Sequence, residues 1–83
     1  MSGAQNPALI QAFAAVLRQA RHASGLTQEG LAHAADVDRT YVGLLENGRR
    51  QPSLSALFSL ASALGISAES LIRKIAQQTR LES

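Results

Sequence analysis

The sequence predicts an all-α fold, with five short helices in a single domain. Its 83 residues suffice for one small domain but not for two. Apolar residues make up 46% of the chain, and most of them are Ala and Leu, which favour helices. No run of Val, Ile or Thr alternates with polar residues, so strands are not expected. We expect one domain over residues 1–83, with its core at about 7–78.

The first helix is expected at residues 7–23. Asn6 is a favoured N-cap, and Pro7 fits the first helical position. Ser24-Gly25 is a typical helix end. Apolar residues recur every three or four positions between these limits and predict one buried face, made of Leu9, Ile10, Phe13, Leu17 and Ala20.

Two shorter helices follow, at about 28–34 and 39–46. Thr27 and Asp38 are their expected N-caps, and Asn47-Gly48 ends the second of them. The connection between the two helices is short, so they should meet at a steep angle, as in a helix-turn-helix. Their inward-facing residues are expected to be Leu31, Ala32, Val42 and Leu45, and Ala35 should close the turn.

The last two helices are expected at about 54–64 and 68–78. Pro52-Ser53 begins the first and Gly65 ends it, whereas Ser67 caps the second. Residues 79–83 should be frayed. The apolar positions of these helices are Leu57, Leu60, Ala61 and Leu64 in the first and Leu71, Ile72 and Ile75 in the second.

Composition excludes several kinds of site. The sequence has no cysteine, which rules out disulfides and cysteine zinc sites. His22 and His33 lie in no metal-binding motif and are predicted to be surface residues. Asp36 and Asp38 are predicted to be a turn residue and an N-cap. No nucleophile–base pair or phosphate-binding glycine loop is visible, so we expect no enzyme activity, metal or cofactor.

The charge distribution is compatible with a nucleic-acid partner. Net charge is +2 and the sequence pI is about 9.9, a weak basic bias. Arg18 and Arg21 precede a mostly acidic stretch at 29–47, and Arg49 and Arg50 follow it. Positive charge therefore flanks this stretch at both ends. No apolar run is long enough to span a bilayer and no signal peptide is visible, so a cytoplasmic location is expected.

The segment "GLTQEGLAHAADVDRTYVGLLENGRRQPSLSALFSLASALGIS" resembles the phage-repressor (Cro/XRE-type) helix-turn-helix family. The resemblance covers about residues 13–75, and "DRTYVGLLENGRRQPSL" is particularly similar to the controller proteins of restriction–modification systems. It implies a compact five-helix, lambda-repressor-like domain whose second and third helices form the helix-turn-helix. The matching marks are Gly25-Leu26-Thr27-Gln28, Leu31-Ala32, Tyr41-Val42, Glu46-Asn47-Gly48, Pro52-Ser53-Leu54 and Leu60-Ala61-x-Ala63-Leu64-Gly65.

Base contacts are expected from the third helix. Since Val42 and Leu45 should be buried, the opposite face carries the residues that would meet base edges in the major groove. Arg39 is the best candidate, because Arg pairs bidentately with guanine. Thr40 can donate, accept or contact a thymine methyl, whereas Leu44, where the family often has a polar residue, can only make apolar contact. The predicted base-contacting set is Arg39, Thr40, Gly43 and Leu44.

Phosphate contacts are expected on both flanks of that helix. By resemblance, Gln28 anchors to phosphate at the start of the second helix, where free N–H groups assist it. Tyr41 either donates its hydroxyl to phosphate or is simply a packed aromatic. The loop with Arg49 and Arg50 either tracks the backbone or is solvated. The predicted phosphate-binding set is Thr27, Gln28, Tyr41, Asn47, Arg49, Arg50 and Ser53, and the resemblance implies a buried structural ion pair between Arg21 and Glu46.

The predicted function is sequence-specific DNA binding by a transcriptional regulator that acts as a homodimer. One unit reads too few base pairs, whereas a twofold dimer reads a near-palindrome with both recognition helices one DNA turn apart. We expect no separate oligomerisation domain, so the dimer surface should come from the last two helices and the tail. RNA polymerase is a further candidate partner. The predicted dimer residues are Phe58, which is either core or subunit contact, Ile66, Leu71, Ile72 and Ile75.

An alternative function is an antitoxin-type module that masks a toxin and also regulates its own promoter. Antitoxins of this fold often carry additional toxin-binding segments, and this chain has only short ends. A neighbouring toxin gene, or co-purification with a second small protein, would favour the alternative.

Overall fold

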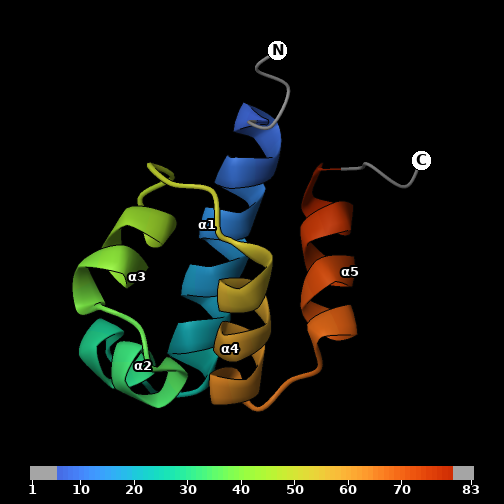
Figure 1. Ribbon diagram of the computed structural model, residues 1–83. Helices are drawn as coiled ribbons and strands as arrows, with labels where there is room; N and C mark the ends of the chain where they lie inside the picture. The colour runs from blue at the N-terminus through green and yellow to red at the C-terminus, as the bar shows by residue number, and fades with distance from the viewer. Residues whose placement is uncertain (1–5, 80–83) are drawn as a thin grey trace.

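The computed structural model describes residues 6–79 and contains five helices in that range (Figure 1). They are α1 (Pro7–Ala23), α2 (Gln28–Ala35), α3 (Arg39–Glu46), α4 (Leu54–Leu64) and α5 (Ala68–Thr79). Each lies within one residue of its predicted bounds, so the all-α prediction is confirmed. Thr79 closes α5 instead of fraying, and the rest of the predicted frayed end, 80–83, lies outside the described residues.

The helix boundaries are set by the side chains that sequence patterns indicated. Asn6 Oδ1 accepts the N–H of Leu9 at 3.1 Å, and Thr27 Oγ1 accepts the N–H of Gly30 at 2.9 Å. Asp38 caps the third helix in the same manner. These bonds satisfy N–H groups that have no partner inside the helix. The first residue of each of these helices is therefore fixed by a neighbouring side chain.

The turn between α2 and α3 uses a left-handed residue that is not glycine. Asp36 has φ of 58°, and its N–H donates to the carbonyl of His33 at 3.2 Å. Val37 N–H reaches back to the carbonyl of Ala32 at 2.9 Å, which closes the end of α2. Asp38 is the N-cap of α3, so only Asp36 and Val37 lie between the last residue of α2 and this cap. This compact turn packs α2 directly against α3.

All five helices contribute to one hydrophobic core. α1 packs against α3 and α5, and α4 packs against α2 and α5. In Figure 1, α1, α4 and α5 form one side of the molecule, and α2 and α3 cover the other. The large side chains that are fully buried come from every helix: Phe13, Leu17, Leu31, Val42, Leu45, Leu60 and Leu71.

Two residues predicted for the dimer surface belong to this core. Leu71 is fully buried and Ile75 is 6% exposed, so both side chains pack mainly inside the protein and offer little area to a second subunit. They lie four residues apart on α5 and therefore share one face of the helix, which packs on α1. Ile72, one position from Leu71, points elsewhere and is 47% exposed.

Within residues 6–79, no single helix is long and apolar enough to cross a membrane. Only α4 and α5 taken together satisfy such a test of length and composition, as a pair bent by 107°.

Candidate DNA-binding surface

α3 has a buried face and an exposed face, as its sequence predicted. Val42 and Leu45 are fully buried against the core. Arg39 and Thr40 are exposed at the start of the helix, and Gly43 and Leu44 are half-buried one turn later. The four predicted base-contacting residues therefore lie away from the core, on a two-turn helix that a DNA major groove can admit.

The side chain of Gln28 lies close to Gly43 on this exposed face. A Cβ atom at Gly43 would lie 4.0 Å from Gln28 Oε1, which is ordinary contact. The Gln28 amide therefore lies beside α3 at this position, where a Cβ would also fit. Gln28 joins the surface of α3 although it belongs to α2.

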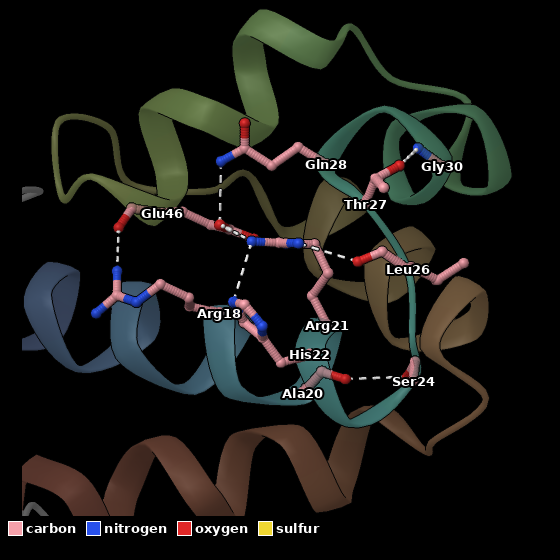
Figure 2. A network of polar contacts seen from close by, with 10 residues as sticks. All are labelled: Arg18, Ala20, Arg21, His22, Ser24, Leu26, Thr27, Gln28, Gly30 and Glu46. Atoms are coloured by element: carbon pink, nitrogen blue, oxygen red, sulfur yellow. Dashed lines mark hydrogen bonds and ion pairs between the residues drawn. The ribbon is translucent and has the colours of Figure 1, made fainter.

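Glu46 is the centre of a polar network that joins three helices (Figure 2). It is 3% exposed, and its Oε2 and Oε1 accept from Arg21 Nε at 2.6 Å and Nη2 at 3.0 Å. Gln28 Nε2 also donates to Oε1, at 3.1 Å. The bidentate pair gives the buried carboxylate the partner that it requires. The structure thus contains the ion pair that the resemblance implied.

Arg21 also joins the network to the start of the helix-turn-helix. Its Nη1 donates to the carbonyl of Leu26 at 2.9 Å, just before the cap of α2. The hydrogen bonds to Glu46 raise the pKa of Arg21 above its ordinary value, so the guanidinium stays charged. His22 has a ring nitrogen 3.4 Å from Arg21 Nη2 and is exposed, as is His33.

The placement of Gln28 differs in one respect from its predicted phosphate role. One amide hydrogen is taken by Glu46, so the side chain is held inside the protein network rather than extended to solvent. A phosphate oxygen needs a donor, and the second amide hydrogen and the backbone N–H groups at the start of α2 are the donors that remain. Gln28 is thus both a structural residue and a candidate phosphate contact.

Other predicted phosphate contacts also make bonds inside the protein. The Tyr41 hydroxyl accepts the N–H of Ser53 at 3.3 Å, and Ser53 Oγ accepts the N–H of Ala56 at 3.0 Å. Thr27 Oγ1 caps α2. In each case the oxygen is the acceptor, so the hydroxyl hydrogen remains a donor for a phosphate. Tyr41 therefore joins α3 to the start of α4, whatever else it contacts.

The loop after α3 is the most open part of this surface. Asn47, Arg49 and Arg50 are exposed. Gly48 lies between them with φ of 69°, a conformation that favours glycine. The Gln11 side chain also approaches Gly48 so closely that a Cβ there would collide with it. The turn therefore directs two arginines away from the core at the end of α3.

Sequence reasoning missed two polar residues of α1 that contact this region. Arg18 Nη1 donates to the backbone carbonyl of Glu46 at 2.7 Å, and Gln11 Nε2 donates to the carbonyl of Gly48 at 3.4 Å. Along α1, Arg18 follows Gln11 by seven residues and precedes Arg21 by three, which places all three on one face of the helix. That spacing is a signal in the sequence, but only packing shows that the face meets α3.

Exposed apolar residues lie on α4 and α5, outside the helix-turn-helix. Leu54 is 71% exposed and Phe58 is 55% exposed on α4, and Ile72 lies on α5. An open cavity of about 320 Å³ lies beside Leu54 and Ile72, between α1, α4 and α5. Ile66, also predicted for the dimer, is half-buried. Leu54 was not predicted for this surface, because its position in the first turn of α4 gave no indication of its exposure.

Among residues 6–79, no three His, Asp or Glu side chains come together in a way that would hold a metal ion. Asp36 and Asp38 lie at the turn and at the N-cap that the sequence indicated for them.

Comparison with known proteins relates this geometry to a family. The helix-turn-helix family matches residues 17–71. The transcriptional regulator DdrOP3 of Deinococcus deserti is 41% identical over 59 residues, which cover 71% of this chain and 46% of that protein. The chain thus spans about half the length of this curated relative.

Two solved structures share the arrangement of helices. The restriction–modification controller protein C.AhdI of Aeromonas hydrophila superposes with a TM-score of 0.72 and 44% identity, covering 75% of this chain and 94% of that one. The controller C.Esp1396I, solved as a tetramer with its natural 35-base-pair operator, gives a TM-score of 0.79 and 25% identity over 86% of this chain and 93% of that one. The present chain belongs to the helix-turn-helix family, in its phage-repressor (Cro/XRE) branch.

Proposed function

We propose that this protein is a sequence-specific DNA-binding transcriptional regulator that inserts α3 into the major groove. The observation that carries the proposal is the division of α3 into two faces. Val42 and Leu45 anchor the helix in the core, whereas Arg39 and Thr40 lie exposed on its other side. A helix held in this way presents its outward side chains to base edges.

Donors on both sides of α3 support this orientation. The first turn of α2 offers backbone N–H groups, with the amide of Gln28 beside them. Arg49 and Arg50 follow α3 and are exposed. Phosphates on the two sides of a groove can therefore be bound while α3 lies between them. Such contacts fix register and give salt-dependent affinity.

We infer a homodimer on a near-palindromic site. Only three side chains of the predicted base-contacting set, those of Arg39, Thr40 and Leu44, can reach bases from α3, which is too few to specify a unique site, so a second copy is needed. Leu54 and Phe58 on α4 and Ile72 on α5 are exposed apolar side chains, and Leu54 and Ile72 line the same open cavity, so this region is suited to a subunit contact. C.Esp1396I, a relative of 25% identity, is a tetramer on its operator.

A restriction–modification controller is the specific role that we propose. C.AhdI, with 44% identity, is named as such a protein. The prediction is that genes for a methyltransferase and an endonuclease lie beside the gene for this chain. Two further predictions depend on this function. One is a cytoplasmic location, where bacterial DNA lies, and the other is a contact with RNA polymerase.

Substituting Arg39 tests the base-contact proposal. Arg39→Ala should weaken binding to a selected operator by roughly 1–3 kcal/mol and relax the preference at one base pair in each half-site. Fluorescence anisotropy with the operator and with single-base variants measures both effects. If Arg39→Ala binds the operator as tightly as the unmodified protein, Arg39 does not read a base.

Arg50→Ala provides the contrast, because a phosphate contact carries no sequence information. It should weaken binding to all duplexes similarly and lower the slope of log K against log salt concentration by about one. Lys74→Ala, which removes one exposed cation from α5, is the matched control and should leave the slope unchanged. Loss of selectivity in Arg50→Ala, with an unchanged slope, would contradict the assignment.

A further inference from the structure

The C-terminal end of α3 is held by side chains of α1. Arg18 Nη1 donates to the backbone carbonyl of Glu46 at 2.7 Å, a short charge-assisted hydrogen bond (Figure 2). Gln11 holds the carbonyl of Gly48 at 3.4 Å, two residues later. α3 has no basic residue in its own last turn. Arg18 therefore supplies the cation that the negative end of a helix favours.

Neighbouring carbonyls of α3 are satisfied by the turn itself. Those of Gly43, Leu44 and Leu45 accept the N–H groups of residues 47, 49 and 48, at 3.0, 2.9 and 3.2 Å. Arg18 donates to the next carbonyl in line, that of Glu46. The last turn of α3 and the loop after it thus depend on a donor from another helix.

Glu46 is consequently fixed at both its side chain and its backbone. Arg21 holds the carboxylate and Arg18 holds the carbonyl, from positions three residues apart on α1. Two contacts from one helix restrict the tilt of α3 as well as its position. Because α3 is only eight residues long and has two apolar anchors, such a restraint acts on most of its length.

We propose that Arg18 is a positioning residue that sets the orientation of α3 and thereby the selectivity of DNA binding. The proposal rests on the proposed function, in which α3 reads bases. Contacts with base edges tolerate displacements of only about 0.5 Å or 10–20°. Arg18 acts through Glu46 and the last turn of α3, and it does not contact the DNA in this proposal.

Affinity and its salt dependence distinguish this role from a phosphate contact. In Arg18→Ala, operator affinity should fall by up to about tenfold, because the free energy of one charge-assisted hydrogen bond no longer holds α3 in its binding orientation before DNA binds. Affinity for a scrambled duplex should stay within about twofold, and the salt slope should not change. Arg18→Lys keeps a charged donor and should recover most of the operator affinity. Lys74→Ala again serves as the charge-matched control.

Two outcomes would overturn the proposal. Equal losses on operator and scrambled DNA, together with a slope lower by about one, would make Arg18 a phosphate contact. Unchanged operator affinity in Arg18→Ala, with folding verified by circular dichroism, would leave it no role in recognition.

Amide hydrogen exchange tests the same restraint without DNA. The N–H groups of Asn47 and Arg49, which are bonded to carbonyls of α3, should exchange at least several-fold faster in Arg18→Ala than in the unmodified protein. Amides of Leu60 and Leu71 in the core should keep their rates. Unchanged exchange at Asn47 and Arg49 would refute the restraint. If the unmodified protein selects no DNA site, the proposed function fails, and the exchange rates still decide whether Arg18 restrains α3.

Discussion

Glu46 shows how one residue links the core to the proposed DNA-binding surface. Its carboxylate is buried and receives donors from Arg21 and Gln28, and its carbonyl receives one from Arg18. The family pattern predicted the pair with Arg21, because both residues stand at matching positions in the sequence. It did not predict Gln28 or Arg18 as partners, since a motif shows which residue types recur but not which hydrogen of an amide is already bonded.

Replacing Glu46 should be strongly destabilising. Glu46→Ala leaves the Arg21 guanidinium, only 12% exposed as a side chain, without its carboxylate. The expected loss is about 3 kcal/mol in the free energy of unfolding, at the low end for a broken buried pair because Arg21 lies near the surface. For a domain of this size, the midpoint of thermal unfolding should fall by about 10 °C or more.

The matched control is Glu29→Ala, which removes an exposed carboxylate from α2 and should change the unfolding free energy by at most about 0.5 kcal/mol. Glu46→Gln keeps an acceptor oxygen for Arg21, so its unfolding free energy should lie between those of Glu46→Ala and Glu29→Ala. Equal stability of Glu46→Ala and Glu29→Ala would mean that the ion pair contributes nothing to folding.

At the scale of the element, helix ends were predictable and helix faces were less so. Caps depend on a few neighbouring residues, so Asn6, Thr27 and Asp38 could be recognised locally. The sequence could not show which face of α5 is buried, because the apolar residues at 71, 72 and 75 span a wider arc of the helix than the part that contacts the core. Only the packing of α5 on α1 shows that Ile72 is the exposed member.

The N-cap of α3 positions the residues expected to contact bases. Asp38 Oδ1 accepts the N–H of Thr40 at 3.2 Å, in the turn that carries Arg39. Asp38→Ala should lower the free energy of unfolding by about 1 kcal/mol and weaken operator binding, because the first turn of α3 frays. Chemical denaturation and anisotropy measure the two effects.

Asp38→Asn separates capping from charge. Asn is as good an N-cap as Asp, so this variant should keep the stability of the unmodified protein although it lacks the negative charge. If Asp38→Asn is destabilised as much as Asp38→Ala, the side chain stabilises the protein through its charge and not as a cap.

At the scale of the whole molecule, two features together favour a dimer: the few side chains on the exposed face of α3, and the exposed apolar residues of α4 and α5. The first limits what one copy can recognise, and the second offers a contact to a second copy. The domain measures 33 × 25 × 19 Å, so two copies with their α3 helices about 34 Å apart are close enough to touch. Selectivity beyond these contacts would come from the shape of the DNA between the half-sites.

The dimer surface also marks the limit of sequence-based prediction for this chain. The sequence indicated the two helices that carry exposed apolar residues, but it placed the buried Leu71 and Ile75 on the predicted dimer surface together with Ile72. Apolar character alone cannot separate a core residue from an interface residue, because burial of either is driven by the same removal of apolar area from water. The exposed fractions of Leu54, Phe58 and Ile72 separate them directly.

Selection of binding sites from random duplex DNA tests the central claim most directly, when the unmodified protein is compared with Ile72→Asp. The unmodified protein should be a dimer in sedimentation at micromolar concentration. It should enrich a near-palindrome with half-sites about 10 base pairs apart from centre to centre. Ile72→Asp should sediment as a folded monomer and enrich half-sites weakly or not at all. Failure of the unmodified protein to enrich any sequence, or enrichment of a single asymmetric site by a strict monomer, would contradict this account.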